Sequence, residues 1–474
     1  GFDVNDSFAA FATAESGDKE PDFYILLPVT DYAQLTDPNF RVSQPDTNGI
    51  SAVGMGPSGQ YFIRKAGSFA LMSKDYRKLS SMAAIISGAK ATGLASSLDA
   101  AQAKQSSSEP IWAYVNMAKI SLIYKTQISE GLDEMKKHMA NATAATKQNT
   151  AFMAGFMNAF ADIAKDFMQQ SKSITLTCNP KPTVLNFRVG LDALPGTKMA
   201  GMLVADGAAK SNPLMGYTED GAAMNLVGRM NRTLMKKCNV IGMNLIATMA
   251  GKDANDPNIV KTRIFLDDYA DSMGDFAAFS LKIDPNTKPF FDAKYVLEVK
   301  DVNRFNKAND AFAEIWTGST FDDLYKSMGM ETSFTLKRGA ENYKGVSIDH
   351  AKLSMKYTDA NSPEAKMIDA MYGGGFEYRW AVVNGLWVCR ISSDPNAIYK
   401  LIDQVKAGKP AETCQEMQKA IAYIPDAGGK DVVFTYNYLR LMKMMQAMTP
   451  MPFTMPDIAS KSNLVFAAKV DNGS

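Results

Sequence analysis

The sequence predicts an α+β protein with two duplicated halves, each a largely antiparallel sheet with helices on one face. The first observation is a repeated segment, because Phe-Ala-Ala-Phe occurs at 8–11 and at 276–279. A proline follows it at 21 and at 289, so both features recur at a spacing of 268 (276 − 8 and 289 − 21). The second observation is that strand-like segments come in pairs, too close together for the crossover helix that parallel strands need.

The order of the repeated features divides the chain. After a two-residue insertion, Leu27, Val29 and Asp31 match Leu297, Val299 and Asp301. We therefore expect a first α+β repeat over 1–192, a bridging or inserted segment over 193–275, and a second repeat over 276–474.

The first half contains the following expected elements, in chain order: a hairpin over Phe8–Asp31, a hairpin of Tyr61–Arg64 and Phe69–Met72, a helix from about Ser73, a strand over Ile111–Met117, helices from Lys119 to about Gln170, and strands over Ser173–Cys178 and Thr183–Leu191. Asp31 is expected to cap a short helix, because its carboxylate can accept from exposed amides at a helix start.

The middle and second half contain these expected elements: a strand over Ala222–Arg229, helices over Arg232–Ala250 and Phe265–Met273, a hairpin over Phe276–Asp301, a helix over Val302–Ile315, a hairpin of Phe376–Val383 and Leu386–Ile391, a helix from Asp394 to Val405, and a strand over Val432–Tyr438. Asn384-Gly385 between two strand-like runs is typical of a type I′ turn. The last strand resembles Ile111–Met117, with Asn437 in the place of Asn116.

The helix expected before Gln170 has an apolar stripe. Phe152, Phe156, Phe160, Ile163 and Phe167 recur at three-, four- and seven-residue steps, so they share one face. This face either packs on the sheet of its own half or lines an apolar ligand cavity, with Phe152, Phe156 and Phe160 as the candidate ligand-binding residues. It could also dock a partner or a membrane surface.

Charge and hydropathy argue against a nucleic-acid partner and against a membrane-spanning helix. Lys plus Arg number 51 and Asp plus Glu 50, so the chain has no global positive field that would attract nucleic acid. No window reaches the ~18 apolar residues of a membrane-spanning helix. Gly1 stands where Met would, which is compatible with a removed signal peptide.

Four cysteines lack the close spacing of a metal site. Pairing Cys178 with Cys238 and Cys389 with Cys414 would place one disulfide in each half. The alternative is four buried thiols.

Catalytic constellations are scarce. The only histidines are His138, expected on a solvated helix face, and His350, expected on a strand face, and no Gly-x-Ser-x-Gly elbow accompanies them. Adjacent carboxylates, Asp267-Asp268 and Asp322-Asp323, diverge on a helix and are expected near helix starts. We therefore predict no catalytic residue.

Two further features favour neither a cofactor nor a metal. The loops Gly54–Gly59 and Gly373–Gly375 lack the Lys-Ser/Thr that follows a phosphate-binding loop. Six methionines, at 442, 444, 445, 448, 451 and 455, have the thioether chemistry of Cu(I) ligands, but their partly helical spacing favours packing.

Short motifs resemble bacterial exported proteins of unknown function with a duplicated α/β unit. In these a strand ending in Val-x-Asp precedes a hairpin and Ser-x-Asp-Pro-x-x-Ile/Leu. The matching residues are Val29-Thr30-Asp31, Val299-Lys300-Asp301 and Ser393-Asp394-Pro395-Asn396-Ala397-Ile398, while Ser73-Lys74-Asp75-Tyr76 in the first half lacks the proline. The resemblance implies export and carries no catalytic residue.

These observations predict a non-enzymatic exported protein, periplasmic or extracellular, acting by binding or assembly in the cell envelope. A protein partner or self-assembly is expected. The alternatives are a carrier of lipid or another apolar ligand, and a carboxylate-based hydrolase.

Overall fold

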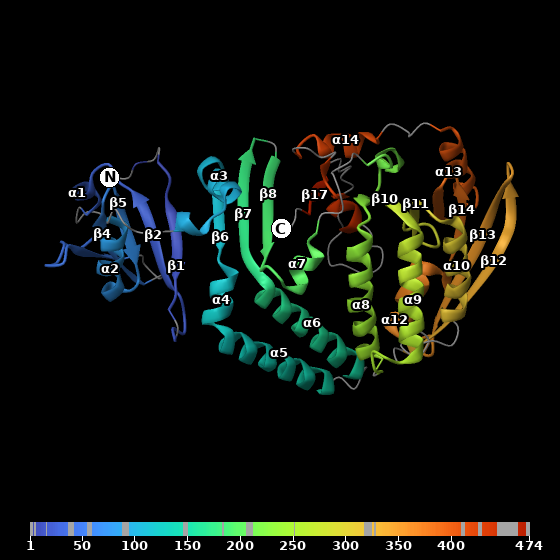
Figure 1. Ribbon diagram of the computed structural model, residues 1–474, viewed down its shortest axis with the longest axis horizontal. Helices are drawn as coiled ribbons and strands as arrows, with labels where there is room; N and C mark the ends of the chain where they lie inside the picture. Colours follow the sequence, from blue (N-terminus) through green and yellow to red (C-terminus); the bar gives the residue numbers. More distant parts are fainter. Residues whose placement is uncertain are drawn as a thin grey trace. The chain divides into compact units, whose positions relative to one another are not determined.

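The structure is a computed structural model that describes the chain except residues 1–2, 4–5, 16, 37–41, 55–58, 88–93, 146–149, 183, 205–211, 251, 317–324, 327–328, 409–412, 425–428, 443–462 and 471–474. The side chains of residues 95, 139–145, 150–159, 249, 313–314, 363–364, 367 and 370 are also not described. The chain forms two compact units (Figure 1): the first is 1–128, 174–180 and 187–189, and the second is 129–173, 181–186 and 190–474.

The first unit holds a five-stranded antiparallel sheet. Its order is β1 (Ala9–Thr13), β2 (Asp22–Pro28), β5 (Phe69–Ser73), β4 (Gln60–Ala66) and β3 (Ile50–Gly54). Helix α2 (Tyr76–Ser87) covers one face, where Tyr24, Leu71 and Leu79 are buried together.

A short helix, α1 (Tyr32–Leu35), packs with a second buried cluster that contains Ile63 and Ala70. Asp31 caps α1, because its carboxylate accepts hydrogen bonds from the amides of Ala33 and Gln34. This confirms the capping role predicted for Asp31.

A three-stranded sheet has the order β6 (Ile111–Val115), β7 (Ser171–Lys181) and β8 (Val184–Ala193). β6 pairs antiparallel with β7 from Ile111 opposite Cys178 to Val115 opposite Ile174. The elements before and within this sheet are η3 (Leu94–Ser97), α3 (Ala100–Ser108), α4 (Met117–Ile123), α5 (Lys125–Ala145) and α6 (Thr150–Gln170).

The second unit holds a nine-stranded sheet whose described pairings are all antiparallel. Its order is β12 (Met330–Tyr343), β13 (Val346–Tyr357), β14 (Gly375–Val383), β15 (Leu386–Ile391), β11 (Phe291–Val299), β10 (Met273–Ile283), β9 (Met224–Arg229), β16 (Val432–Tyr436) and β17 (Leu464–Ala468). Helices together with antiparallel sheets confirm the predicted α+β class.

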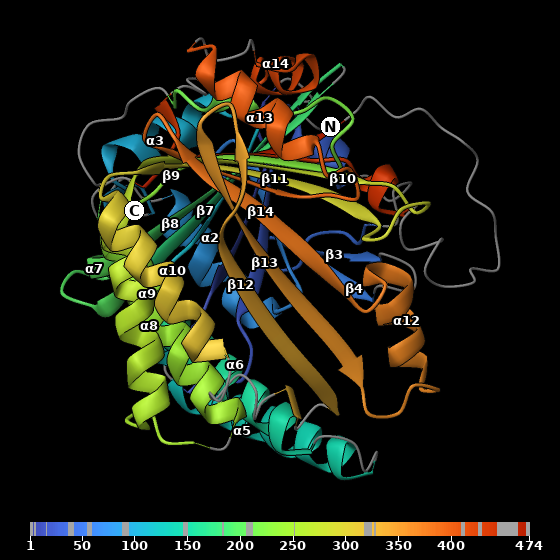
Figure 2. The same ribbon diagram turned by 90° about the vertical axis from the view of Figure 1, so that its right-hand side faces the viewer.

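Helices cover both faces of this sheet. The helical elements of the unit are α7 (Lys198–Met202), η4 (Met215–Tyr217), α8 (Arg232–Met249), α9 (Pro257–Ser272), α10 (Val302–Trp316), α12 (Pro363–Tyr372), α13 (Ala397–Lys406) and α14 (Gln415–Ile421). Figure 2 shows α13 and α14 on one side of the sheet and α8, α9 and α10 on the other. The prediction of helices on one face is therefore too simple for this sheet.

Buried clusters show the same two sides. Ile348, Val388 and Ile398 of α13 belong to one cluster, while Met273, Val299 and Phe305 of α10 belong to another. We call the side that carries α13 the upper face.

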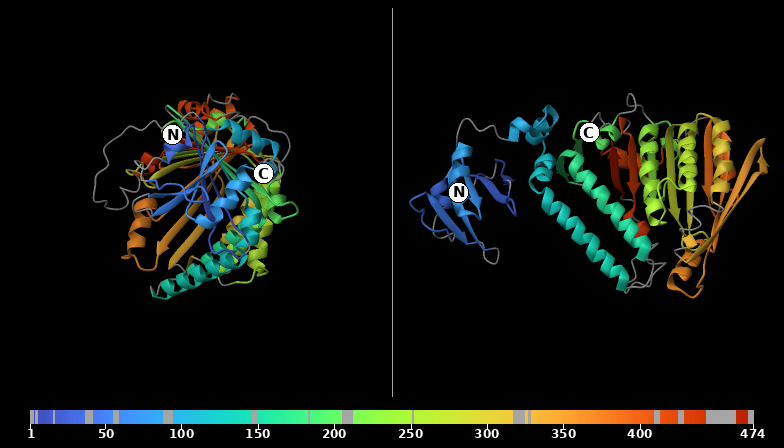
Figure 3. Two further views of the ribbon diagram at one scale, coloured as in Figure 1. Left: turned by 90° about the vertical axis from the view of Figure 1, so that its left-hand side faces the viewer. Right: turned by 60° about the horizontal axis from the view of Figure 1, so that its bottom comes forward.

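Helices α5 and α6 run side by side in opposite directions (teal in Figure 3), and Lys136 of α5 lies 3.3 Å from Asp162 of α6. α6 packs against α7 and α8.

The strand order supports a relation between the two larger sheets. β3-β4-β5-β2-β1 in the first sheet has the same order as β13-β14-β15-β11-β10 in the second. The hairpins Ala66–Phe69 and Val383–Leu386 each close with a two-residue loop.

The repeated Phe-Ala-Ala-Phe does not follow this relation. Phe11 stacks on Tyr24 within the cluster that α2 covers. In β10 it is Phe276 that belongs to the cluster beneath α13, whereas Phe279 packs on Tyr295 on the opposite side. Relative to the shared strand order, the motif in β10 is displaced by one residue from the motif in β1. Each of its side chains therefore points to the opposite face of the sheet. The duplication stays a prediction, supported by strand order rather than by this motif.

The compact units also divide the chain differently from the predicted boundaries. Residues 193–275 contribute β9 to the nine-stranded sheet, where it pairs with β10 and β16. The first unit ends its main segment at Ile128 rather than at 192.

Candidate functional site

Polar side chains form one row across the upper face of the nine-stranded sheet. Directly opposed residues on six neighbouring strands are Asn225, Ser280, Lys294, Arg390, Arg379 and His350. Residues opposed in register point to the same face, so the row is continuous. Their immediate neighbours on that face are apolar and buried, as Ala278, Val296 and Val388 show. A polar row inside an apolar core is the feature that most needs an explanation.

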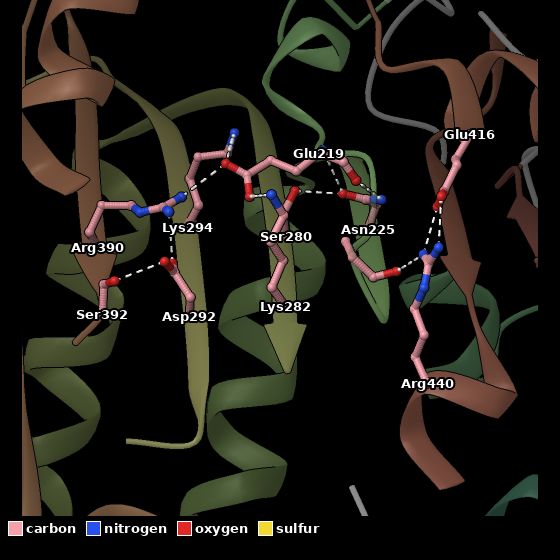
Figure 4. A network of polar contacts seen from close by, with 11 residues as sticks. Glu219, Asn225, Ser280, Lys282, Asp292, Lys294, Arg390, Ser392, Glu416 and Arg440 are labelled. Atoms are coloured by element: carbon pink, nitrogen blue, oxygen red, sulfur yellow. Dashed lines mark hydrogen bonds and ion pairs between the residues drawn. The ribbon is translucent and has the colours of Figure 1, made fainter. Parts of the chain in front are cut away.

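Glu219 lies over the centre of this row (Figure 4). Its Oε1 lies 2.8 Å from Nζ of Lys294 and 3.0 Å from Nη1 of Arg390. Its Oε2 lies 3.2 Å from Nζ of Lys282. One carboxylate therefore meets three cations from three strands, β10, β11 and β15.

The network extends by one further acid. Nη2 of Arg390 lies 2.7 Å from Oδ1 of Asp292. The Ser392 hydroxyl donates to the other oxygen of Asp292 at 2.8 Å. We call the set Glu219, Lys282, Asp292, Lys294, Arg390 and Ser392 the charged network.

Asn225 holds the backbone of Glu219 in place. Its side-chain oxygen accepts from the Glu219 amide at 3.0 Å, and its amide group donates to the Glu219 carbonyl at 3.1 Å. The Ser280 hydroxyl donates to the same Asn225 oxygen. A two-way amide clamp of this kind fixes a turn to a strand.

The charges shift the pKa of both central groups. Burial alone raises the pKa of Glu219, but Lys294 and Arg390 outweigh it and lower that pKa to about 2. Burial lowers the pKa of Lys294, and Glu219 partly offsets this. Glu219 is therefore ionised at neutral pH.

A second ionic pair lies along the same face (Figure 4). Arg440 donates to both carboxylate oxygens of Glu416 at 2.7 Å, and its Nη1 also donates to the carbonyl of Ala222 at 2.8 Å. The Glu416 amide donates to Asp220 at 2.9 Å. The pair fastens α14 and the segment after β16 to the turn before β9.

The geometry suits fastening rather than acid–base chemistry. A general acid needs a carboxyl whose pKa is raised toward neutrality. Among the described residues, every carboxylate with a shifted pKa has it lowered. The hydrolase alternative gains no support from the charged network.

The two histidines lie where the sequence placed them. His138 is exposed on α5. His350, on β13, has Glu341 3.0 Å from Nε2 and Glu377 2.9 Å from Nδ1. Arg379 lies 3.4 and 3.5 Å from the same two carboxylates, so this guanidinium pairs with both acids that flank His350.

The predicted carboxylate pair Asp267-Asp268 diverges, as expected. Asp267 accepts from Asn239 at 3.4 Å, and Asp268 from Arg304 at 2.6 Å. Its predicted place near a helix start is wrong, because α9 begins at Pro257. Asp322-Asp323 lies outside the described residues.

The phenylalanine stripe of α6 is only partly described. Phe160 is 52% exposed, and Ile163 and Phe167 are also exposed. The side chains of Phe152 and Phe156 lie outside the description. Two cavities of about 590 and 430 Å³ are lined by other residues, around Met355 and around Glu298. Phe160 lines neither of these two cavities. The carrier alternative therefore stays a prediction.

Cys178, Cys238, Cys389 and Cys414 are all free in the structure, and Cys238 is exposed rather than buried. The pairing of Cys178 with Cys238 stays a prediction, because the two residues lie in different units. Cys389 is buried with Trp380 and Ala351 beneath the sheet, whereas Cys414 packs with Met417 on the upper face. The sheet separates these two thiols. The described residues contain no cluster of metal-ligating groups.

Two loops and the methionine cluster complete the predicted features. Gly373 ends α12 with a φ of +61°, as a helix cap. The centre of the Gly54–Gly59 loop and all the clustered methionines except Met442 lie outside the described residues.

The three-stranded sheet exposes apolar side chains that the sequence analysis did not single out. Ile111 and Val115 of β6, Leu176 of β7, and Phe187 and Val189 of β8 are exposed, the last two by 63% and 69%. We call these five residues the open apolar face. All five belong to the first unit.

The five residues share one face. Ile111, Ala113 and Val115 share one face of β6, because every second residue of a strand points the same way. Leu176 of β7 lies opposite Ala113 and therefore points to that face too. On the other face, the Ser173 hydroxyl of β7 donates to the carboxylate of Asp192 in β8. The odd-numbered residues of β7 and the even-numbered residues of β8 therefore share that other face. Phe187 and Val189 therefore lie on the side of Leu176.

The other face of this sheet is partly buried along β7 although it is rich in polar groups. Thr175 and Thr177 are buried, and Trp112 stacks on Tyr114 there. The usual pattern of a one-sided sheet places apolar residues inward and polar residues outward. Here the exposed face is the apolar one.

Comparisons with protein-family models, with curated proteins and with solved structures gave no match. Among the described residues, no helix has the length and apolar character needed to cross a membrane.

Proposed function

We propose that this chain acts by binding or assembly, as a non-enzymatic exported protein, and that the open apolar face is the surface it binds with. The observation that carries the proposal is the exposure of Ile111, Val115, Leu176, Phe187 and Val189 on one face. Contiguous exposed apolar surface on a soluble protein marks interaction sites, because water is expelled when a partner covers it.

The charged network supports the same proposal from the other unit. Its acidic and basic groups pair with one another, and Lys294 and Arg390 hold Glu219 ionised. Such a network fixes a surface in one conformation and leaves no acid poised for proton transfer. The network therefore supports a structural rather than a catalytic role for the second unit.

Export is the part of the proposal that rests on the resemblance of the short motifs alone. Fractionation of the cells that make the protein tests it. Recovery of the chain in the envelope or medium, with cytoplasmic markers absent, is expected. Recovery with those markers would overturn export and leave the binding proposal open.

Binding is tested by purifying the tagged full chain from its own cells and measuring the mass of what elutes by light scattering. We expect the wild-type chain to elute as an oligomer or with a stoichiometric protein partner. A double variant, Phe187→Ser with Val189→Ser, should elute as a monomer, because it makes the centre of the open apolar face polar.

The matched control is Ile264→Ser. Ile264 is 57% exposed on α9 of the other unit, so the change removes a comparable exposed apolar group. The control should keep the wild-type mass. A monomeric wild-type chain without partner, or a double variant that keeps the wild-type assembly, would contradict the proposal.

A further inference from the structure

The larger of the two described cavities, about 590 Å³, lies between the end of β13 and α12 (Figure 2). Lys288, in the loop between β10 and β11, and Gly374, just before β14, line it as well. A volume of this size falls within the range of binding sites for small organic molecules. All of these segments belong to the second unit, so the cavity lies within one compact unit.

Main-chain hydrogen bonds hold the segments around the cavity together. The amide of Met355, near the end of β13, donates to the carbonyl of Gly374 at 3.1 Å. The amide of Phe290, two residues after Lys288, donates to the carbonyl of Met371 in α12 at 3.0 Å. The fold itself therefore forms the walls of the cavity.

The apolar part of the lining comes from Met355, Ala360, Ala365 and Ile368. Such groups hold a hydrocarbon because both surfaces leave water when they come into contact. The flexible thioether of Met355 can adapt to chains of different shape. This part of the cavity therefore suits an aliphatic chain.

Three lysines lie at the mouth of the cavity, since Lys288, Lys356 and Lys366 line it and are also exposed. Asp369 is the only carboxylate that the structure describes among the lining residues, and it lies 3.5 Å from Nζ of Lys288. Neither Lys356 nor Lys366 has an ion-pair partner within the part of the chain that the structure describes. The described lining therefore carries a formal charge of +2 (three lysines minus one aspartate).

We propose that this cavity binds an amphiphilic anion, which is an aliphatic chain that ends in a carboxylate or a phosphate. The chain lies against Met355 and Ile368, and the anionic group lies at the mouth beside Lys356 and Lys366. A hydrocarbon without charge leaves these two lysines unpaired, and an inorganic anion leaves the apolar lining uncovered. Lysine suits both head groups, because its ammonium acts as a compact point charge.

The site is separate from the surfaces already described. It differs from the carrier site predicted on α6, since no described residue of α6 lines this cavity. It is also independent of the open apolar face, whose five residues belong to the first unit. The inference therefore goes beyond the proposed function and does not rest on it.

Isothermal titration calorimetry of the full chain tests the site with octanoate and with octyl phosphate. Both should bind saturably, one molecule per chain, and the tighter of the two identifies the head group. Octanol has the chain without the charge and should bind more weakly than either anion. Acetate has the charge without the chain and should not saturate over the same concentration range.

Single variants at the mouth test the charge. Lys356→Gln and Lys366→Gln should each weaken octanoate binding about two- to fivefold, which is the effect of one exposed ion pair. Neither should change the binding of octanol. Lys352→Gln is the matched control and should keep the wild-type affinity, since Lys352 is an exposed lysine of the same strand that does not line the cavity.

The methyl resonance of Met355 gives a readout of position in the wild-type chain. Methionine methyl groups are labelled with carbon-13, and Met355→Leu assigns the resonance. Octanoate should shift it with the same concentration dependence that calorimetry gives, because the chain of the ligand contacts this side chain.

Two results would contradict the inference. Absence of saturable binding by both anions, or binding that leaves the Met355 methyl resonance unchanged, would overturn the site. Equal affinities for octanoate and octanol, with unchanged octanoate affinity in both lysine variants, would overturn the anionic head group and with it the proposal. Phe187→Ser with Val189→Ser should leave octanoate binding unchanged, so failure here does not bear on the open apolar face.

Discussion

At the residue scale, Glu219 is the group on which the upper face of the nine-stranded sheet depends. It neutralises Lys294, whose side chain is only 5% exposed. A buried ammonium without a counter-charge is expensive, because burial favours its neutral form. The turn that carries Glu219 is therefore tied to strands β10, β11 and β15 together.

Replacing Glu219 tests this directly. We expect Glu219→Gln to lower the free energy of unfolding by about 3–5 kcal/mol, because Lys294 and Arg390 lose their shared carboxylate. Urea denaturation followed by circular dichroism measures it. Asp369→Asn is the control, since the exposed Lys288–Asp369 pair at 3.5 Å should contribute only about 0–1 kcal/mol. Equal effects of the two changes would contradict the role given to Glu219.

The ion pair between Glu219 and Lys294 also predicts that the stability of the fold depends on pH. The pKa of Glu219 is about 2 in the folded chain and ordinarily 4.5, so the unfolded chain takes up the proton first as the pH falls. The stability that Glu219 contributes is therefore complete above about pH 4.5 and is lost as the pH falls toward 2. The difference in unfolding free energy between wild type and Glu219→Gln should shrink over this window. A difference that stays constant from pH 6 to pH 3 would rule out this linkage.

Gly375 is a second residue whose identity the structure requires. Its φ is +152°, and a Cβ there would lie 2.3 Å from the carbonyl oxygen of Leu353 on the paired strand. We expect Gly375→Ala to cost at least about 2 kcal/mol of unfolding free energy. Gly242→Ala in α8, where a Cβ meets nothing within 4 Å, should be neutral or stabilising. Thermal denaturation of the two variants compares them, and a neutral Gly375→Ala would show that the close approach is absent.

At the element scale, short-range chemistry was readable from the sequence. Asn384-Gly385 predicted a tight hairpin, and the structure gives both residues positive φ, 50° and 75°. Asp256-Pro257 also carries a start signal, since Asp256 caps α9 and Pro257 is its first residue. The helix predicted over Phe265–Met273 does not use this signal and begins eight residues late.

Long-range pairing was not readable in the same way. The charged network joins Glu219, Lys294 and Arg390, which are far apart in the chain and come together only when β11 and β15 pair. The available signal was a Lys or Arg inside an otherwise apolar strand. That signal marks a buried ion but does not name its partner.

The asparagine caps allow a test at this scale. Asn116→Ala removes a side-chain acceptor from the start of α4 and should cost about 1 kcal/mol. Asn437→Ala should cost more, because Asn437 is fully buried and the amide of Arg440 loses its acceptor. Chemical denaturation measures both, and Asn116→Asp, which keeps the acceptor, should be near wild type. Loss of stability with Asn116→Asp equal to that with alanine would contradict a capping role.

At the scale of the whole molecule, the α+β class followed from strands in close pairs, because that spacing excludes parallel crossovers. The predicted repeat boundaries did not describe the compact units. The sequence places β9 outside both repeats, yet β9 joins β10 to β16 inside the second sheet. A strand that pairs on both sides through main-chain groups leaves little trace in side-chain pattern beyond its apolar residues.

The open apolar face was also beyond reach of the sequence. Phe187 and Val189 alternate with polar residues, as a half-buried strand would, and alternation does not say which face is covered. Only the structure shows that Thr175 and Thr177 are buried while Phe187 and Val189 are exposed.

The central claim is that this face contacts a protein in the cell, and site-specific photo-crosslinking tests it most directly. Phe187 is replaced by p-benzoylphenylalanine, which keeps an aromatic ring at the site, and the cells are irradiated before lysis. We predict one dominant crosslinked protein, identified by mass spectrometry, that is absent when the same probe replaces the exposed Ile264 of α9. No crosslink from position 187, or the same set of products from both positions, would contradict the account.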